Sequence, residues 1–290
     1  MLLYRLSFSH AILTRLKKQP DGILVDGNPV TVRYVLHTGQ TLSLAIEDKL
    51  PHQPQMGVCF AAMPEVLYED DWLIAVDKPA GMPTHPSPGH YGDSLACALS
   101  VYYAEKGVPF VFRSPSRLDR NTSGVLLAAK NAVACSVLNR QHQQGLYEKT
   151  YFAVLQGEPE APEGLIDAPI GREAGSVIKR CVSPHGDRAQ TAYRVLHTFE
   201  REGRKFCAVL AFPRTGRTHQ IRVHFAHIGC PLAGDDLYGG DRSLIGRHAL
   251  HAYQIGILHP KSGEKTVITA PLPADLQELI GSERAKISLP

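Results

Sequence analysis

The sequence predicts an α+β fold in which a mixed, largely antiparallel central sheet is flanked by helices. Strand-like segments outnumber helical ones, and several follow one another without a helix between them. No regular alternation of strand and helix runs along the chain, which argues against a doubly wound parallel sheet. The 290 residues, 43% of them hydrophobic, are sufficient for one large domain or for two.

Residues 1–50 are expected to form a small α+β unit. Residues 9–18 (SHAILTRLKK) have the apolar spacing of a short basic helix. The dipeptide Asp26-Gly27 separates two short β-prone runs and predicts a tight turn. Residues 51–64 are predicted to be a linker, because they open on a stretch rich in proline and glycine.

Residues 65–275 are expected to form the main domain, and residues 276–290 a C-terminal tail. Two helices stand out within the main domain. Residues 131–145 (NAVACSVLNRQHQQG) predict a helix that begins at an asparagine N-cap and ends at a glycine. Residues 218–229 (THQIRVHFAHIG) predict a second helix, opened by Thr218 and closed by a glycine.

Composition narrows the class of protein. The net charge of +3 permits nucleic-acid binding without arguing for it. The six cysteines are scattered and form no CxxC pair, so we expect reduced thiols and neither a zinc site nor a disulfide framework. No segment approaches the roughly 20 apolar residues of a membrane helix, and the first residues lack a signal-peptide pattern. We therefore expect a cytoplasmic protein that does not engage a membrane.

The segment SRLDRNTSGVLLAAK, residues 116–130, places one carboxylate, Asp119, between Arg117 and Arg120. The polar residues and the glycine that follow favour a tight turn into an apolar strand. An aspartate between arginines is often a surface ion pair of little energetic value. A neighbouring arginine also keeps an aspartate ionised, which suits a nucleophile or general base that acts on an anionic polymer. Composition alone leaves both interpretations open.

Residues 212–229 carry the densest basic cluster, which contains Arg214, Arg217, His219, Arg222, His224 and His227. Arginines at the entry of the predicted helix could contact phosphates, and a solvated basic face is the alternative. The histidines lack metal-ligand spacing and a nearby carboxylate, so no metal site is expected. Arg222 lies among apolar neighbours and therefore needs a carboxylate partner, for which Asp119 is a candidate.

Residues 147–157 (YEKTYFAVLQG) predict a strand whose alternation places Lys149 and Tyr151 on one face. A tyrosine in a strand most often belongs to the core. The lysine on the same face indicates that this face is not simply buried. An aromatic ring beside a cation is a common means of stacking an unpaired base while holding its backbone.

These segments together resemble the RluA-type pseudouridine synthases, in which Arg-Leu-Asp is followed two residues on by Thr-Ser-Gly. Four further stretches agree in the same order, namely EDDWLIAVDKPAGMPTHPS, EKTYFAVLQG, TGRTHQIRVHFAHIGCPLAGDDLYGG and RHALHAYQIGILHP. The resemblance covers about residues 65–273 and implies the pseudouridine synthase fold for the main domain.

The resemblance also implies roles for individual residues. Asp119 would attack the target uridine, and the freed uracil would be re-attached through carbon five. Tyr151 would pack against the flipped base and take part in proton transfer, and Arg222 would pair with Asp119 and hold the nucleotide. Leu250 matches a position that closes the uracil pocket. The resemblance implies no cofactor and no metal. Further substrate-binding residues are expected at Arg117, Lys149, Arg217 and His219.

The sequence departs from the family pattern at two positions. Ser116 replaces the usual histidine before Arg-Leu-Asp, and we expect this to affect local packing or an RNA contact. Asp187 replaces the lysine of the usual Gly-Lys-x-Ala-x-Thr, which puts an RNA contact there in doubt. Residues 1–50 resemble the second half of an αL-type RNA-binding domain, first seen in a ribosomal protein, without its opening helix.

The expected partner is ribosomal or transfer RNA, with ribosomal RNA favoured, and the protein is expected to act as a monomer. One alternative is an RNA-binding protein on the same fold, such as a ribosome-assembly factor, which would have little need of Asp119, Tyr151 and Arg222 together. Another is a hydrolase that uses Asp119, but no partner acid, base or metal ligand has matching spacing.

Overall fold

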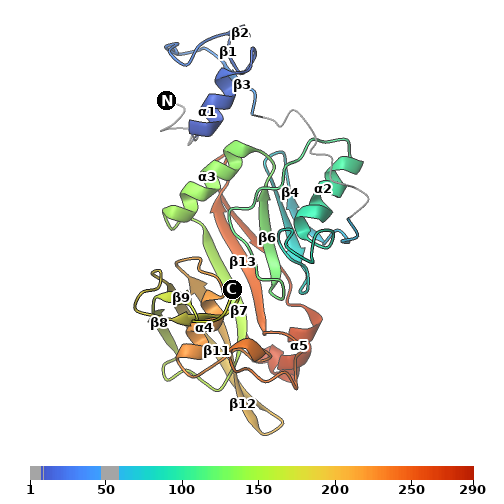
Figure 1. Ribbon diagram of the computed structural model, residues 1–290, viewed down its shortest axis with the longest axis vertical. Helices are drawn as coiled ribbons and strands as arrows, with labels where there is room; N and C mark the ends of the chain where they lie inside the picture. The colour runs from blue at the N-terminus through green and yellow to red at the C-terminus, as the bar shows by residue number, and fades with distance from the viewer. Residues whose placement is uncertain (1–7, 9, 47–58) are drawn as a thin grey trace.

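The computed structural model of the chain describes residues 8, 10–46 and 59–290 (Figure 1). Most of the predicted linker, residues 51–64, lies outside the described residues. Within these residues, no helix is long and apolar enough to cross a membrane.

The N-terminal unit consists of one helix and a small antiparallel sheet. Its elements are α1 (His10–Lys17), β1 (Ile23–Val25), β2 (Asn28–Pro29) and β3 (Leu42–Leu44), with the sheet order β2-β1-β3. The turn at Asp26-Gly27 is confirmed, since both residues have positive φ angles of 50° and 80°. Leu16 and Ile23 share a small core with Val133, so the unit rests on a helix of the main domain, as Figure 1 also shows.

The main domain is built on a nine-stranded sheet in the order β4-β5-β6-β13-β7-β12-β11-β8, with β14 paired to β13. All strand pairs of this sheet are antiparallel except β6 and β13, which run parallel. The predicted mixed, largely antiparallel sheet is therefore confirmed. Its strands are β4 (Val66–Glu69), β5 (Leu73–Lys78), β6 (Ser123–Ala129), β7 (Glu148–Gln156), β8 (Glu163–Asp167), β11 (Gln190–Arg201), β12 (Arg204–Pro213), β13 (Leu250–Leu258) and β14 (Lys265–Thr269).

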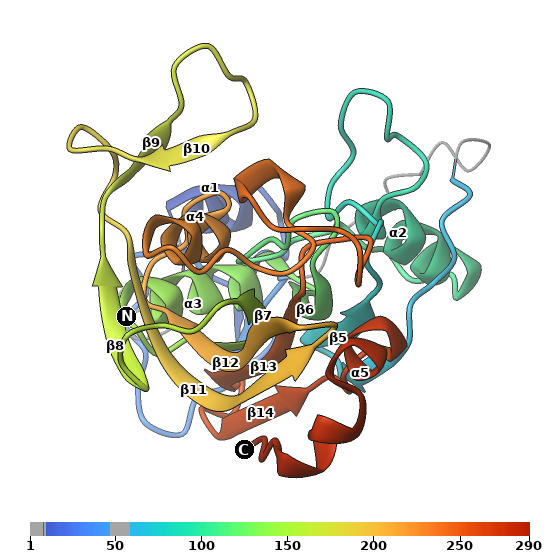
Figure 2. The ribbon, with the colours of Figure 1, turned by 90° about the horizontal axis from the view of Figure 1, so that it is seen from below.

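Helices cover both faces of this sheet. They are α2 (Leu95–Glu105), α3 (Ala132–Gln143), α4 (Gln220–His227) and α5 (Ala274–Ile280). Apolar residues of α2 and α4 belong to the core cluster on one face, and those of α3 and α5 to clusters on the other. Figure 2 shows α4 and α5 on opposite sides of the strands. The alternation predicted for β7 is confirmed, because Tyr151 faces the α4 side and Phe152 faces the α5 side.

One predicted helix agrees with the structure at its start, and the other begins later than expected. The side chain of Asn131 accepts a hydrogen bond from the Ala134 backbone and caps α3. The expectation that Thr218 opens α4 is wrong. His219 adopts a left-handed conformation with φ of 57°, so the helix begins only at Gln220. The left-handed residue turns the chain sharply just before the helix.

Two further segments complete the domain. A short hairpin, formed by β9 (Ile170–Arg172) and β10 (Arg180–Val182), projects from the sheet next to α4 (Figure 2). Residues 276–290, which are predicted to be a C-terminal tail, form most of α5 and the 3-10 helix η2 (Gly281–Lys286). Leu276 and Leu279 are buried in the core cluster around α5, so this segment packs against the sheet.

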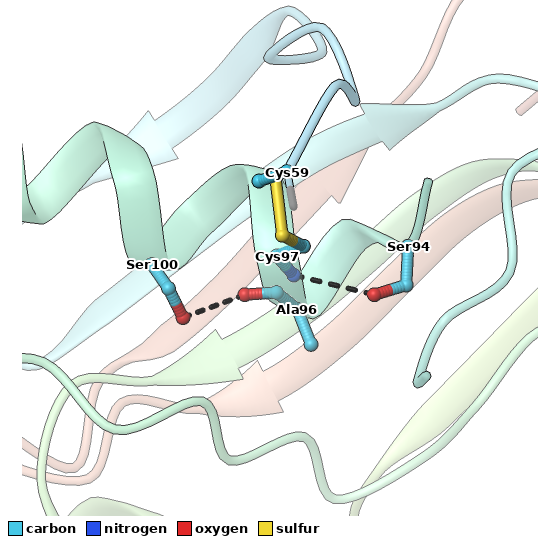
Figure 3. Close-up of a disulfide and its surroundings, with 5 residues drawn as sticks. All are labelled: Cys59, Ser94, Ala96, Cys97 and Ser100. Atoms are coloured by element: carbon cyan, nitrogen blue, oxygen red, sulfur yellow. Dashed lines mark hydrogen bonds between the residues drawn. A yellow bond between two sulfur atoms is a disulfide. The ribbon is translucent and has the colours of Figure 1, made fainter. Parts of the chain in front are cut away.

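Cys59 and Cys97 are joined by a disulfide between the segment that precedes β4 and the first turn of α2 (Figure 3). Their Cα atoms lie 5.8 Å apart. The expectation of reduced thiols is therefore wrong for this pair. The remaining cysteines, Cys135, Cys181, Cys207 and Cys230, are free.

Candidate active site

A cavity of about 260 Å³ opens between the loop that precedes β6 and the N-terminal end of α4. All of the residues predicted to form the site line this cavity, although they come from segments far apart in the sequence. They are Arg117, Asp119, Lys149, Tyr151, Arg217, His219, Arg222 and Leu250. The structure thus brings together the complete predicted set, while the role of each residue stays a prediction.

A buried lysine holds the loop that carries Asp119 through hydrogen bonds to the backbone. Lys78 is fully buried at the end of β5, and its Nζ donates hydrogen bonds to the carbonyls of Pro79, Met82 and Arg120 at 2.8 to 3.1 Å. Burial lowers the pKa of Lys78 to about 7, against the opposing effect of the nearby Asp119 charge. The lysine therefore ties the β5 turn to the backbone directly after Asp119.

The other end of the loop is fixed by residues that precede β13. Arg247 donates a hydrogen bond to the carbonyl of Asn121 at 3.1 Å and is itself paired with Asp275. The Thr122 hydroxyl lies 2.8 Å from Nε2 of His248. Burial, with the charges of Arg222 and Arg247, lowers the pKa of His248 to about 2, so this ring stays neutral.

The strand that leaves the loop requires glycine at position 124. Gly124 has φ of 109°, and a Cβ placed there would lie 2.2 Å from the carbonyl oxygen of Ala252 in β13. The absence of a side chain permits the parallel contact between β6 and β13. This contact sets Asp119 opposite the end of β13, where Leu250 lies.

Arg222 is the buried cation of the cavity wall. It donates two hydrogen bonds of 2.7 Å to the two carboxylate oxygens of Asp235, whose side chain is fully buried. Its Nη1 also lies 3.4 Å from Oδ2 of Asp119. The predicted pair of Arg222 with Asp119 is confirmed, but Asp235 is the closer partner. Burial opposes the charge of Arg222, yet its hydrogen bonds and ion pair with Asp235 raise its pKa.

His219 also lines this side of the cavity, and Tyr238 packs behind it against both His219 and Arg222. The guanidinium of Arg222 lies 5.0 Å from the centre of the Tyr238 ring, within cation–π distance. The Tyr238 hydroxyl lies 2.8 Å from Nδ1 of His219, and Nε2 of His219 lies 3.8 Å from Oδ2 of Asp119. Burial lowers the pKa of His219, which favours the neutral ring, although the charge of Asp119 opposes the shift.

Tyr151 and Leu250 form the apolar wall. They lie on the neighbouring strands β7 and β13, and both are more than nine-tenths buried. Burial, followed by the influence of Tyr147 and of the Asp119 charge, raises the pKa of Tyr151, so its hydroxyl stays protonated. A flat apolar ring with a neutral hydroxyl therefore lines the same cavity as Arg222.

Cations surround the cavity mouth. Lys149 is largely buried, and burial lowers its pKa to about 8; its Nζ lies 3.4 Å from Nε2 of His142. Arg117 donates a hydrogen bond of 2.6 Å to the Thr218 hydroxyl. This hydroxyl, which was expected to cap α4, therefore accepts from Arg117. Arg120 is not among the residues that line this cavity, and its Nε donates a hydrogen bond of 3.0 Å to the carbonyl of Gly81, so it stabilises the loop.

Sequence reasoning missed several residues that position the site, namely Lys78, Asp235, Tyr238, Arg247 and His248. For Lys78 a signal was present, because a lysine at the end of an apolar strand indicates a buried cation with a specific partner. Across residues 8, 10–46 and 59–290, no group of histidine, cysteine or acidic residues is arranged to hold a metal ion.

The site combines an accessible carboxylate, a buried arginine, an aromatic wall and a cationic mouth on a mixed sheet, which are the elements of an enzyme that acts on an anionic substrate with a planar group. Residues 72–227 match the family model described as RNA pseudouridylate synthase. The chain therefore belongs to this family.

Relatives and solved structures agree with this assignment. The chain is 38% identical over 281 residues to an uncharacterized RNA pseudouridine synthase, YjbO, of Bacillus subtilis, which covers 96% of both chains. It is 36% identical over 275 residues to the ribosomal large subunit pseudouridine synthase D of Nitrosomonas europaea, covering 90% of this chain and 77% of the relative. The structure of human RNA pseudouridylate synthase domain containing 1 matches with a TM-score of 0.60 and 27% identity, covering 72% of this chain and 83% of the human one. The protein is thus an isomerase that modifies RNA.

Proposed function

We propose that this enzyme converts a specific uridine of ribosomal RNA to pseudouridine, with Asp119 as the nucleophile. One observation carries the proposal: the Asp119 side chain is 24% exposed at the cavity, while its partner Arg222 is 7% exposed and held in place by Asp235. The carboxylate can therefore reach a substrate, and the cation beside it has a fixed position.

The proposed reaction is an isomerisation that needs no co-reactant. The Asp119 carboxylate attacks C1′ of the target ribose, and a bond between a carboxylate oxygen and C1′ forms as the bond between N1 of uracil and C1′ breaks. The uracil turns within the cavity, and its C5 forms the new bond to C1′ as Asp119 is released. C5 loses its proton and N1 gains one, so atoms and charge balance.

The cavity suits one extruded base. Its volume of about 260 Å³ and its lining by Tyr151, Leu250 and Arg222 can hold a single uracil. A base must leave its stack to enter, which costs a few kcal/mol and favours loops and bulges over intact helices. The Tyr151 hydroxyl, kept neutral by burial, is proposed to take part in proton transfer at the turning ring.

Ribosomal RNA is proposed as the substrate because relatives in two bacteria carry the name ribosomal large subunit pseudouridine synthase D. The unit formed by residues 10–46 is proposed to add RNA affinity through the exposed basic end of α1, at Lys17 and Lys18. The expectation of a cytoplasmic monomer stays a prediction.

The test is to map pseudouridines in ribosomal and transfer RNA from cells that lack the gene. We expect one or more sites in ribosomal RNA to disappear, to return with the wild-type gene and to stay absent with the Asp119→Asn gene. A lost site in transfer RNA alone would overturn the substrate assignment. Restoration by Asp119→Asn would overturn the role of Asp119.

Lys149 predicts a pH dependence of RNA binding. Because its pKa is lowered to about 8, its charge is present at pH 7 and is lost as the pH rises to 9. We expect affinity for a ribosomal RNA fragment to fall roughly tenfold between these values, since a hydrogen bond to a charged group contributes about 1.5 kcal/mol. Lys149→Arg should make this dependence clearly smaller, because arginine stays charged and only Lys78, whose pKa is lowered to about 7, still loses its charge in this range. Fluorescence anisotropy at constant ionic strength measures both proteins, and an unchanged wild-type affinity from pH 7 to 9 would contradict the prediction.

A further inference from the structure

A second cavity, of about 400 Å³, lies between the β9–β10 hairpin and the loop that precedes α4. It shares Gly216, Arg217 and Thr218 with the cavity of Asp119, so the two cavities adjoin the same loop. Arg172 and Arg180 line its hairpin side. The residues predicted from the sequence include only Arg217 among these arginines.

The arginines of the hairpin are arranged as if an anion were shared between them. Arg172 and Arg180 are direct partners in the antiparallel register of β9 and β10, and their side chains therefore lie on the same face. Like charges in this arrangement destabilise a strand pair unless an anion compensates them. Nη1 of Arg180 is buried and has no hydrogen-bond partner among the described residues. A buried guanidinium nitrogen of this kind calls for an acceptor.

The third arginine has only a weak partner. Nη1 of Arg217 lies 3.4 Å from Oδ2 of Asp187, and the two side chains are 44% and 75% exposed. An exposed pair at this distance contributes little and opens readily. Asp187 is the only acidic residue among those described as lining the second cavity, and it stands where the family pattern has a lysine.

We propose that the second cavity binds a backbone phosphodiester of the RNA next to the target nucleotide, through Arg172, Arg180 and Arg217. Asp187 forms an ion pair with Arg217 in the free protein and is displaced when the phosphate binds. The replacement of lysine by Asp187 therefore weakens this contact without removing it. The inference rests on the proposed function only in placing the target uridine at Asp119.

The test is the salt dependence of RNA binding by an Arg172→Gln/Arg180→Gln variant. The probe is a fluorescein-labelled oligouridylate, measured by anisotropy from 50 to 200 mM KCl. Each phosphate contact on a single strand contributes about 0.7 to the slope of log affinity against log salt. We expect the slope to fall by about that amount. Arg194→Gln, an exposed arginine on β11 away from both cavities, should match the wild type.

A second variant tests the proposal in the opposite direction. Asp187→Asn frees Arg217 and removes the competing charge, so affinity for the same probe should increase about two- to fivefold. Unchanged slopes in the arginine variant, or weaker binding by Asp187→Asn, would overturn the inference. These results do not depend on catalysis. If Asp119 proved not to be the nucleophile, the predicted salt slopes would still hold. If the arginines proved not to bind a phosphate, Asp119→Asn would still lose its turnover.

Discussion

Asp119→Asn should reduce the isomerisation of uridine by at least about a thousandfold, because an amide cannot replace the carboxylate as the nucleophile. Asparagine has almost the same shape and Asp119 is partly exposed, so the fold should persist. The backbone hydrogen bond from Thr122 to the Asp119 carbonyl and the contacts of Lys78 to the loop do not involve the carboxylate. Affinity for RNA should therefore change little.

Chromatography of nucleosides from treated ribosomal RNA measures the loss of turnover, and anisotropy measures binding. Asp71→Asn is the matched control, since it removes an exposed carboxylate from the turn between β4 and β5. It should leave both quantities unchanged. An Asp119→Asn protein with more than about a hundredth of wild-type turnover would contradict a nucleophilic role.

Asp235→Ala should lower the free energy of unfolding by about 3–5 kcal/mol, because it leaves the buried Arg222 without its closest partner. Asp119 is the remaining carboxylate near this guanidinium, at 3.4 Å. We expect Arg222 to move toward it and to cover the nucleophile, so that turnover also falls strongly.

Urea denaturation followed by circular dichroism measures this loss of stability. The double variant Arg222→Met/Asp235→Leu is the informative control. It removes both charges, and an apolar pair of similar volume is often close to neutral for stability. We expect the double variant to be more stable than Asp235→Ala but inactive. An Asp235→Ala protein within about 1 kcal/mol of the wild type would show that Arg222 does not depend on Asp235.

The sequence predicted the components of the site better than their pairing. Alternation along β7 correctly placed Tyr151 on the side of the cavity, and the apolar surroundings of Arg222 correctly indicated a carboxylate partner. Asp119 is one carboxylate partner of Arg222, but the closer partner, Asp235, was not predicted. Residues 228–234 separate Asp235 from α4, and no local pattern specifies the path of this segment, so the approach of Asp235 to Arg222 could not be predicted.

Other features depend on contacts between distant segments. Lys78 and Arg120 meet through a hydrogen bond across 42 positions, which periodicity along one strand cannot indicate. The start of α4 was placed too early, because a threonine before an amphipathic run is a normal capping signal. The left-handed His219 overrides this signal, and its ring contacts Tyr238 near Asp119. Local capping rules thus failed at a residue whose conformation goes with contacts between distant segments at the site.

The most direct test of Asp119 as the nucleophile is single-turnover release of tritium from ribosomal RNA labelled at C5 of uridine. Forming the bond between C5 and C1′ must break the C5–H bond, so each turnover frees one tritium. The wild-type enzyme should release tritium in proportion to the pseudouridine formed. Asp119→Asn, bound to the same RNA with equal affinity, should release none above background. Equal release by the variant and the wild type would contradict the assignment of Asp119.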